Sequence, residues 1–116
     1  MFSRDQEYNL LRFLAGGLDG GYCIYGAGKF TKELMRFVNR ENLTPPSFIF
    51  DDNPSSDSIP PCDRILRTSE VDFNGVGAVI VGTDTWQNKM KASLAELKIS
   101  CPVIDLAPPQ AAPDKE

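Results

Sequence analysis

Short apolar runs alternate along this chain with longer segments in which apolar residues recur at helical spacing. The short runs are rich in β-branched and aromatic residues, and glycine, proline or aspartate bounds most of them. They predict β-strands at 22–25, 47–50, 64–67, 78–81 and 103–106. The run at 47–50 is almost continuously apolar, which is typical of a strand buried on both faces of a parallel sheet.

Three longer segments carry an apolar stripe and predict amphipathic helices over 4–15, 29–41 and from about Thr85 or Trp86 to Lys98. The expected buried stripes are Leu10, Leu11 and Leu14, with Phe13 near the stripe edge; Phe30, Leu34, Phe37 and Val38; and Trp86, Met90, Leu94 and Leu97. One further helical turn is predicted at 69–72, with Ser69 as N-cap and Asp72 reaching back to it.

Strands that alternate with helical connections predict an α/β fold, in which crossovers place most strands parallel. We expect one three-layer domain with about five mainly parallel strands and helices on both faces. The strand at 22–25 should lie centrally beside the strand at 78–81, and a ligand crevice should open at their carboxyl ends.

The length and composition agree with one domain and exclude several functions. The chain has 116 residues and is 41% hydrophobic, which fits a single domain over 1–106. Residues 107–116 are rich in proline, alanine and charge, so we expect a disordered tail. A net charge of −4 argues against nucleic-acid binding. With no histidine, the chain lacks the commonest general base and metal ligand.

The sequence predicts a cytoplasmic protein. Its three cysteines are widely spaced and form no CxxC pair, which favours reduced thiols rather than a disulfide or zinc framework. No signal pattern opens the chain, and no apolar run approaches the ~18 residues of a membrane span.

A glycine turn between a predicted strand and helix is the best functional signal. Gly26-Ala27-Gly28 opens a degenerate form of the G-x-G-x-x-G pattern, with Thr31 at the third position. Glycines let a backbone approach a pyrophosphate, and the helix that follows offers N–H groups and a positive dipole end. The candidate contacts are Gly26, Ala27, Gly28, Lys29, Phe30 and Thr31. A tight turn that binds nothing is the alternative.

A pair of aspartates follows the second predicted strand. Asp51 lies 25 residues after Gly26 (51 − 26), close to the place where a carboxylate accepts ribose hydroxyls. Such a carboxylate would repel a 2′-phosphate, so an adenosine ligand would be NAD-like. Asp51, Asp52 and Asn53 are therefore candidate contacts, or else they cap a turn before Pro54.

A third candidate segment, Gly82-Thr83-Asp84, ends the strand at 78–81 and would form the second wall of the crevice. Asp84 or Thr85 at such a place is more often an ordinary helix N-cap. Trp86 could stack on a base or sugar, although a tryptophan that heads an apolar stripe is more often part of the core.

Tyr25 and Lys29 match the Tyr-x-x-x-Lys spacing of short-chain dehydrogenases, but they straddle a strand end and a turn instead of sharing a helix face.

From Tyr22 to Leu106 the chain resembles the small Rossmann-like domains of bacterial sugar-modifying proteins. Examples are the N-terminal domain of hexapeptide-repeat sugar acyltransferases and the C-terminal domain of sugar C-methyltransferases. The segments that carry the resemblance are Ile24 to Gly28, Phe50 to Pro54, Ile59 to Pro61, Ile65-Leu66 and Ala78 to Thr83.

The resemblance implies that Gly26, Gly28, Asp51 and Asp52 contact a nucleotide-linked sugar. The catalytic hexapeptide helix, its histidine and any methyltransferase domain are absent from this sequence. We therefore expect a binding module for a nucleotide, nucleotide-sugar or dinucleotide, without catalysis of its own. A separately encoded sugar-modifying enzyme is an expected partner, and formation of a homo-oligomer stays open.

Two other functions remain open at this stage. One is an NAD-dependent oxidoreductase domain that a partner subunit completes. The other is a structural or assembly domain whose crevice no longer binds a ligand.

Overall fold

The computed structural model describes residues 4–15, 21–54, 59–83 and 87–106. Its elements in chain order are α1 (Arg4–Ala15), β1 (Tyr22–Tyr25), α2 (Lys29–Arg40), β2 (Phe48–Asp51), β3 (Ile65–Arg67), η1 (Thr68–Glu70, a 3-10 turn), β4 (Ala78–Val81), α3 (Gln87–Glu96) and β5 (Val103–Ile104). The five strands form one sheet in the order β3-β2-β1-β4-β5, and every neighbouring pair is parallel.

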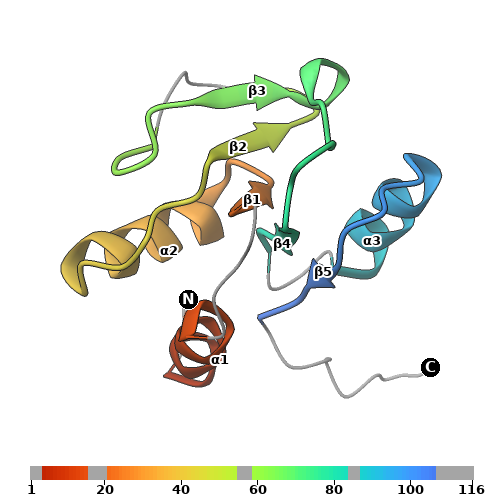
Figure 1. Ribbon diagram of the computed structural model, residues 1–116. Helices are drawn as coiled ribbons and strands as arrows, with labels where there is room; N and C mark the ends of the chain where they lie inside the picture. The colour runs from red at the N-terminus through yellow and green to blue at the C-terminus, as the bar shows by residue number, and fades with distance from the viewer. Residues whose placement is uncertain (1–3, 16–20, 55–58, 84–86, 107–116) are drawn as a thin grey trace.

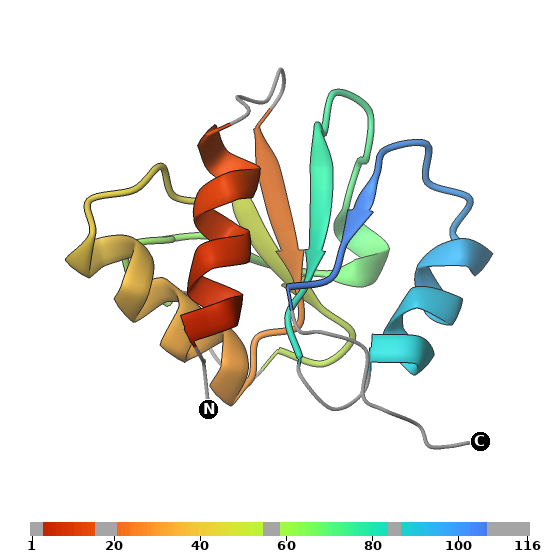
Figure 2. The ribbon, with the colours of Figure 1, turned by 90° about the horizontal axis from the view of Figure 1, so that it is seen from below.

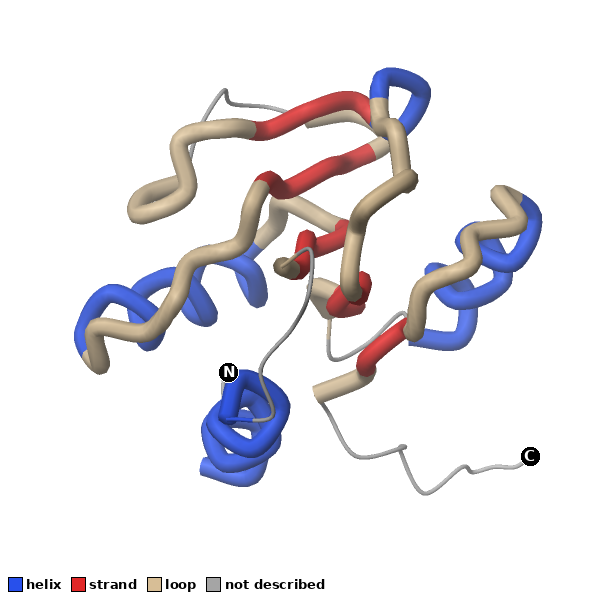
Figure 3. The backbone as a smooth tube through the Cα atoms, viewed as in Figure 1, coloured by secondary structure: helices blue, strands red, loops and turns tan. Residues whose placement is uncertain are grey.

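Helices cover both faces of this sheet, which confirms the predicted three-layer α/β architecture. Figure 1 shows α1 and α2 on one face and α3 on the other, and the turned view in Figure 2 shows the same arrangement. The connection from β3 to β4 contains η1 and loop segments, with no longer helix in it (Figure 3).

The central strand β1 is buried on both faces, because its side chains alternate between two apolar clusters. Tyr22 and Ile24 pack with α1 and α2, whereas Cys23 and Tyr25 pack on the face that Leu94 of α3 covers. Each aliphatic side chain that is buried in this way stabilises the fold by about 1.5–3 kcal/mol. The two-sided burial explains why these strands read as continuous apolar runs.

The strand register brings the glycine turn and the aspartate pair to the same edge of the sheet. Tyr25 of β1 pairs with Phe50 of β2 and with Val81 of β4, so the three strands end within one residue of one another. Residues that follow these strands therefore meet at the carboxyl edge, as the sequence predicted for the crevice.

Several local predictions were wrong. In α1, Leu10 is buried but Leu11 is 41% exposed, and Phe13 packs on the core in its place. Leu97 is 43% exposed because α3 ends at Glu96, before the predicted stripe is complete. Trp86, Thr85 and the predicted tail at 107–116 lie outside the described residues.

The capped turn between β3 and β4 forms one step earlier in the chain than predicted. The turn is Thr68–Glu70, and the Arg67 N–H donates to Glu70 Oε1 at 2.9 Å. Asp72 instead accepts the N–H of Asn74 at 3.0 Å and closes the next loop. Glutamate at the third position therefore caps this turn in place of the predicted Ser69–Asp72 pair.

Candidate functional site

Gly26 makes the sharp turn at the end of β1. Its φ of +108° lies in a region that residues with a Cβ rarely adopt. Its N–H donates to Phe50 O at 2.7 Å, and an added Cβ would lie 2.9 Å from Met90 Cε. This glycine is therefore required by the conformation of the chain, whereas the Met90 side chain is flexible and its terminal methyl group could move aside.

Thr31 replaces the third glycine of the pattern and fastens the turn to α2. Its buried hydroxyl donates to Gly26 O at 2.5 Å. The close approach that a third glycine normally permits is provided here by Gly82, where an added Cβ would lie 2.7 Å from Tyr25 O. Gly82 is thus a packing glycine beneath the turn and does not line the pocket described below.

Gly28 is different, because neither conformation nor packing requires a glycine there. Its φ of −92° and ψ of −159° are extended values that most residues adopt, and an added Cβ would meet nothing within 4 Å. Gly28 is the N-cap of α2, but it offers no side chain to cap the helix. The backbone is therefore open at this point to whatever approaches the start of the helix.

The first turn of α2 contains no acidic residue and begins with Lys29. Lys32, one turn further, is also exposed, and its N–H makes a helical hydrogen bond to Gly28 O at 3.1 Å. The N–H groups that precede it in the helix fall outside the helical ladder. Lysines at the positive end of a helix dipole create a positive potential that an anion would neutralise.

Asp51 links the aspartate segment to the glycine turn. Its Oδ2 accepts the N–H of Ala27 at 2.8 Å, and its Oδ1 accepts the N–H of Asn53 at 2.8 Å. Asp51 therefore holds both the turn after β1 and the turn after β2, as the capping interpretation of this segment predicts. Neither bond excludes a ligand, because a carboxylate has about four acceptor positions.

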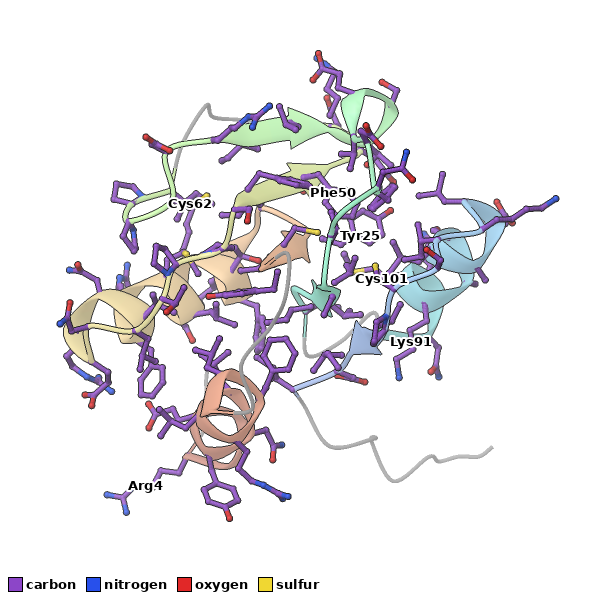
Figure 4. The ribbon with its side chains drawn as sticks, viewed as in Figure 1. Arg4, Tyr25, Phe50, Cys62, Lys91 and Cys101 are labelled. Atoms are coloured by element: carbon purple, nitrogen blue, oxygen red, sulfur yellow. The ribbon has the colours of Figure 1, made fainter. Side chains whose placement is uncertain are left out.

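Asp52 is bonded by hydroxyl groups. Tyr25 Oη donates to both of its carboxylate oxygens at 3.0 Å, and Thr68 Oγ1 donates to Oδ1 at 2.6 Å. The Tyr25 ring stacks on the Phe50 ring, with the centroids 4.7 Å apart and an angle of 5° between the planes (Figure 4). The Asp52 carboxylate is thus oriented by the ends of β1 and β3.

A cavity of about 260 Å³ lies between these carboxylates and α3. Its lining residues come from the carboxyl ends of β1 and β2 and from one side of α3: Tyr25, Asp51, Asp52, Lys89, Met90 and Ser93. Binding sites for drug-sized ligands are larger, about 300–1,000 Å³. This cavity therefore suits one sugar-sized group better than a complete dinucleotide.

Tyr25 is a hydrogen-bonding group and not a base at neutral pH. Burial and the hydrogen bond to Asp52 raise its pKa to about 12, although a hydrogen bond with Ser93 works against the rise. A phenol of this kind stays protonated. Tyr25 is therefore not suited to act as a catalytic base at neutral pH.

The remaining predicted contacts lie in different surroundings. Phe30 is buried in the core with α2, so only its backbone could face a ligand. Thr83 is also buried, whereas the Asn53 side chain is exposed. Thr83, like Gly82, is not among the residues that line the cavity. Asp84 lies outside the described residues.

Four cavity residues were missed as contacts by the sequence reasoning: Tyr25, Lys89, Met90 and Ser93. Lys89 and Ser93 are four residues apart on α3, so both lie on one side of that helix. This polar i, i+4 pair beside the apolar stripe was the available signal. The pair can be identified as part of the cavity only when the position of α3 at the carboxyl edge of the sheet is known.

A second cavity, of about 220 Å³, lies near the amino ends of β1 and β2, and its lining includes Ser47, Arg64 and Asp72. No group of three metal-ligating side chains occurs among the described residues. None of their helices has the length and apolar character needed to cross a bilayer. The three cysteines are free thiols, as predicted, and Cys62 and Cys101 lie apart in the fold (Figure 4).

Comparison of the chain with known proteins returned no match to a family model, to a curated protein or to a solved structure.

Proposed function

We propose that this protein binds a phosphate ester of a sugar, such as a nucleotide-sugar or a nucleotide, and catalyses no reaction by itself. The phosphate would bind at the start of α2, and the hydroxyl groups of the sugar would enter the cavity between Asp52 and α3. The observation that carries the proposal is the open Gly28 at a helix start that carries lysine and no capping side chain.

The phosphate half of the proposal rests on this helix start. Serine, threonine, aspartate, asparagine and glycine are the preferred N-caps, and glycine alone among them has no side chain to accept the first N–H groups; acidic residues are favoured in the first turn. Here Gly28 supplies no side-chain cap, and Lys29 adds a positive charge. A phosphate would supply both the hydrogen-bond acceptors and the negative charge that the helix end lacks.

The sugar half rests on the acceptors in the cavity. Asp51 and Asp52 line it together with the hydroxyl groups of Tyr25 and Ser93. Carboxylates that accept hydrogen bonds from vicinal hydroxyls are the usual partners of ribose at this edge of such a sheet. The cavity volume of about 260 Å³ is enough to hold a single sugar ring.

One hydrogen bond links the proposed phosphate site at Gly28 to the cavity. Ala27, which precedes Gly28, donates its N–H to Asp51 at 2.8 Å. The Asp51 carboxylate thus contacts the residue next to Gly28. A ligand with its phosphate at Gly28 would therefore have its sugar beside the carboxylates. Phosphate and sugar are directly bonded in nucleotides and in sugar phosphates, so one ligand can occupy both places.

The proposed lack of catalysis is supported by the groups that the chain offers. The sequence has no histidine, and Tyr25 stays protonated at neutral pH. A ligand held here would be acted on by a separately encoded enzyme, as the resemblance to domains of sugar-modifying proteins suggests. Recognition and reaction would then be divided between two chains.

Thermal unfolding with NAD, UDP-glucose and dTDP-glucose tests this function. A ligand at about 100 times its Kd stabilises by about 2.7 kcal/mol and raises Tm by several degrees. We expect at least one of these phosphate esters to do so, whereas free glucose does not. If none raises Tm at millimolar concentration, the proposal fails for this ligand class, and the structural or assembly function becomes the better explanation.

A further inference from the structure

The cavity beside α3 carries an excess of negative charge. Among its lining residues, Asp51 and Asp52 contribute two negative charges and Lys89 one positive charge, so the net charge is −1 (1 − 2). The other three, Tyr25, Met90 and Ser93, are uncharged. A ligand group that enters this cavity meets carboxylates on the side of β2 and a single ammonium on α3.

The two carboxylates are held in different ways. Both oxygens of Asp51 accept backbone N–H groups, from Ala27 and from Asn53, so this side chain belongs to the two turns. Asp52 accepts only side-chain hydroxyls among its hydrogen bonds to the described residues. It is also the more exposed of the two. Asp52 is therefore the carboxylate whose remaining acceptor positions can take hydrogen bonds from a ligand.

Tyr25 and Thr68 fix the orientation of Asp52 without neutralising it. Both groups donate from neutral hydroxyls, and Thr68 is the closer at 2.6 Å. A carboxylate with two hydroxyl donors still has free acceptor positions. These positions suit a ligand that donates hydrogen bonds, and they repel a ligand oxygen that is itself negatively charged.

We propose that Asp52 makes the cavity selective for sugars without an acidic group. A neutral hexose would donate its hydroxyls to Asp52, whereas the carboxylate of a uronic acid would face a like charge in a partly enclosed space. Like charges placed together at an interface are strongly unfavourable, and charge-assisted hydrogen bonds are among the strongest available. This selectivity rests on the proposed function, because it assumes that the phosphate is held at Gly28.

Calorimetric titration of the full chain with UDP-glucose and UDP-glucuronic acid tests the selectivity. The two probes have the same nucleotide and differ only at C6 of the sugar, where a hydroxymethyl group replaces a carboxylate. We expect UDP-glucose to bind at least about tenfold more tightly. In the Asp52→Asn variant the preference should fall to less than about threefold, mainly through tighter binding of UDP-glucuronic acid.

Asp51→Asn is the matched control, because it makes the same chemical change one residue earlier. It should weaken both ligands together and retain the preference for UDP-glucose. Equal or tighter binding of UDP-glucuronic acid by the unaltered protein would overturn the proposal. It would indicate that Lys89 binds the carboxylate of the uronic acid. A preference that survives in Asp52→Asn would also overturn the role of Asp52.

The outcomes separate this inference from the proposed function. If UDP-glucose binds but the preference is absent, the selectivity is wrong and the binding function stands. If neither probe binds the unaltered protein, the proposed function fails for nucleotide-sugars and the selectivity fails with it. Circular dichroism of each variant checks that the fold is retained.

Discussion

Tyr25 Oη donates a hydrogen bond to both carboxylate oxygens of Asp52, each at 3.0 Å, and so joins the end of β1 to the residue after β2. Because the Tyr25 ring also stacks on Phe50, the phenol has little freedom to leave Asp52. The same contact raises the pKa of Tyr25 and orients the carboxylate at the mouth of the cavity. The contact therefore contributes both to the stability of the fold and to the orientation of the carboxylate that we propose for binding.

Tyr25→Phe should lower the free energy of unfolding by about 1 kcal/mol at neutral pH, because it removes this hydrogen bond and leaves the packing. The Tyr25 pKa is about 12 in the folded chain and 10.0 in its ordinary environment. Stability from this group is therefore complete below pH 10 and is lost as the pH rises through 12. The difference between wild type and variant should shrink over that window.

Urea unfolding at several pH values from 7 to 12 measures this difference. The comparison with Tyr25→Phe isolates Tyr25 from the other buried groups, such as Cys23, whose pKa is raised to about 12 by burial. If the difference in free energy of unfolding between wild type and Tyr25→Phe stays constant up to pH 12, ionisation of the Tyr25 phenol does not affect the stability of the fold.

Asp51→Asn should destabilise the fold more than Asp52→Asn does. Asp51 accepts two backbone N–H groups at 2.8 Å, and the amide that replaces it has only one acceptor oxygen. An unsatisfied donor in the turn costs about 1–3 kcal/mol. Amide hydrogen exchange should show faster exchange at Ala27 in this variant, and unchanged protection there would contradict the bracing role of Asp51.

Gly82→Ala should be strongly destabilising, by about 1–3 kcal/mol. Its Cβ would lie 2.7 Å from the carbonyl oxygen of Tyr25, and a backbone atom in a central strand cannot easily move aside. Chemical denaturation of the variant measures the loss. If Gly82→Ala were as stable as wild type, the close contact between the ends of β1 and β4 would be wrong.

Native thiol reactivity should separate the three cysteines. Cys23 and Cys62 are buried and burial raises the pKa of both thiols, whereas Cys101 is only half-buried. Thiolates are the reactive form, so an alkylating reagent at pH 8 should label Cys101 first. Mass spectrometry locates the label, and rapid modification of Cys23 in the folded protein would contradict its place in the core.

The sheet was predictable because hydrophobic periodicity and glycine or proline boundaries report directly on strands and helices. The run at 78–81 and the stripe of Phe30, Leu34, Phe37 and Val38 were both confirmed. Prediction failed where a helix end or a cap decided the outcome. Leu97 is exposed because α3 stops early, and Glu70 rather than Asp72 caps the turn at η1.

The candidate site was less predictable, because its geometry depends on contacts between distant segments. The spacing indicated Gly26 and Asp51, but it could not show that Asp51 bonds to Ala27. Likewise, the sequence pattern could not distinguish the structural role of one glycine from that of another. Only the structure shows that the backbone conformation requires Gly26 and that the packing requires Gly82, whereas a Cβ at Gly28 would meet no other atom.

The most direct test of the central claim is calorimetric titration of UDP-glucose into the wild-type chain and into Gly28→Ser. Serine is a good N-cap, so the variant should be at least as stable as wild type. Its hydroxyl would occupy the helix end that we assign to the phosphate. We predict measurable binding by wild type and affinity at least about tenfold lower in Gly28→Ser. Equal affinity in the two proteins would contradict the account.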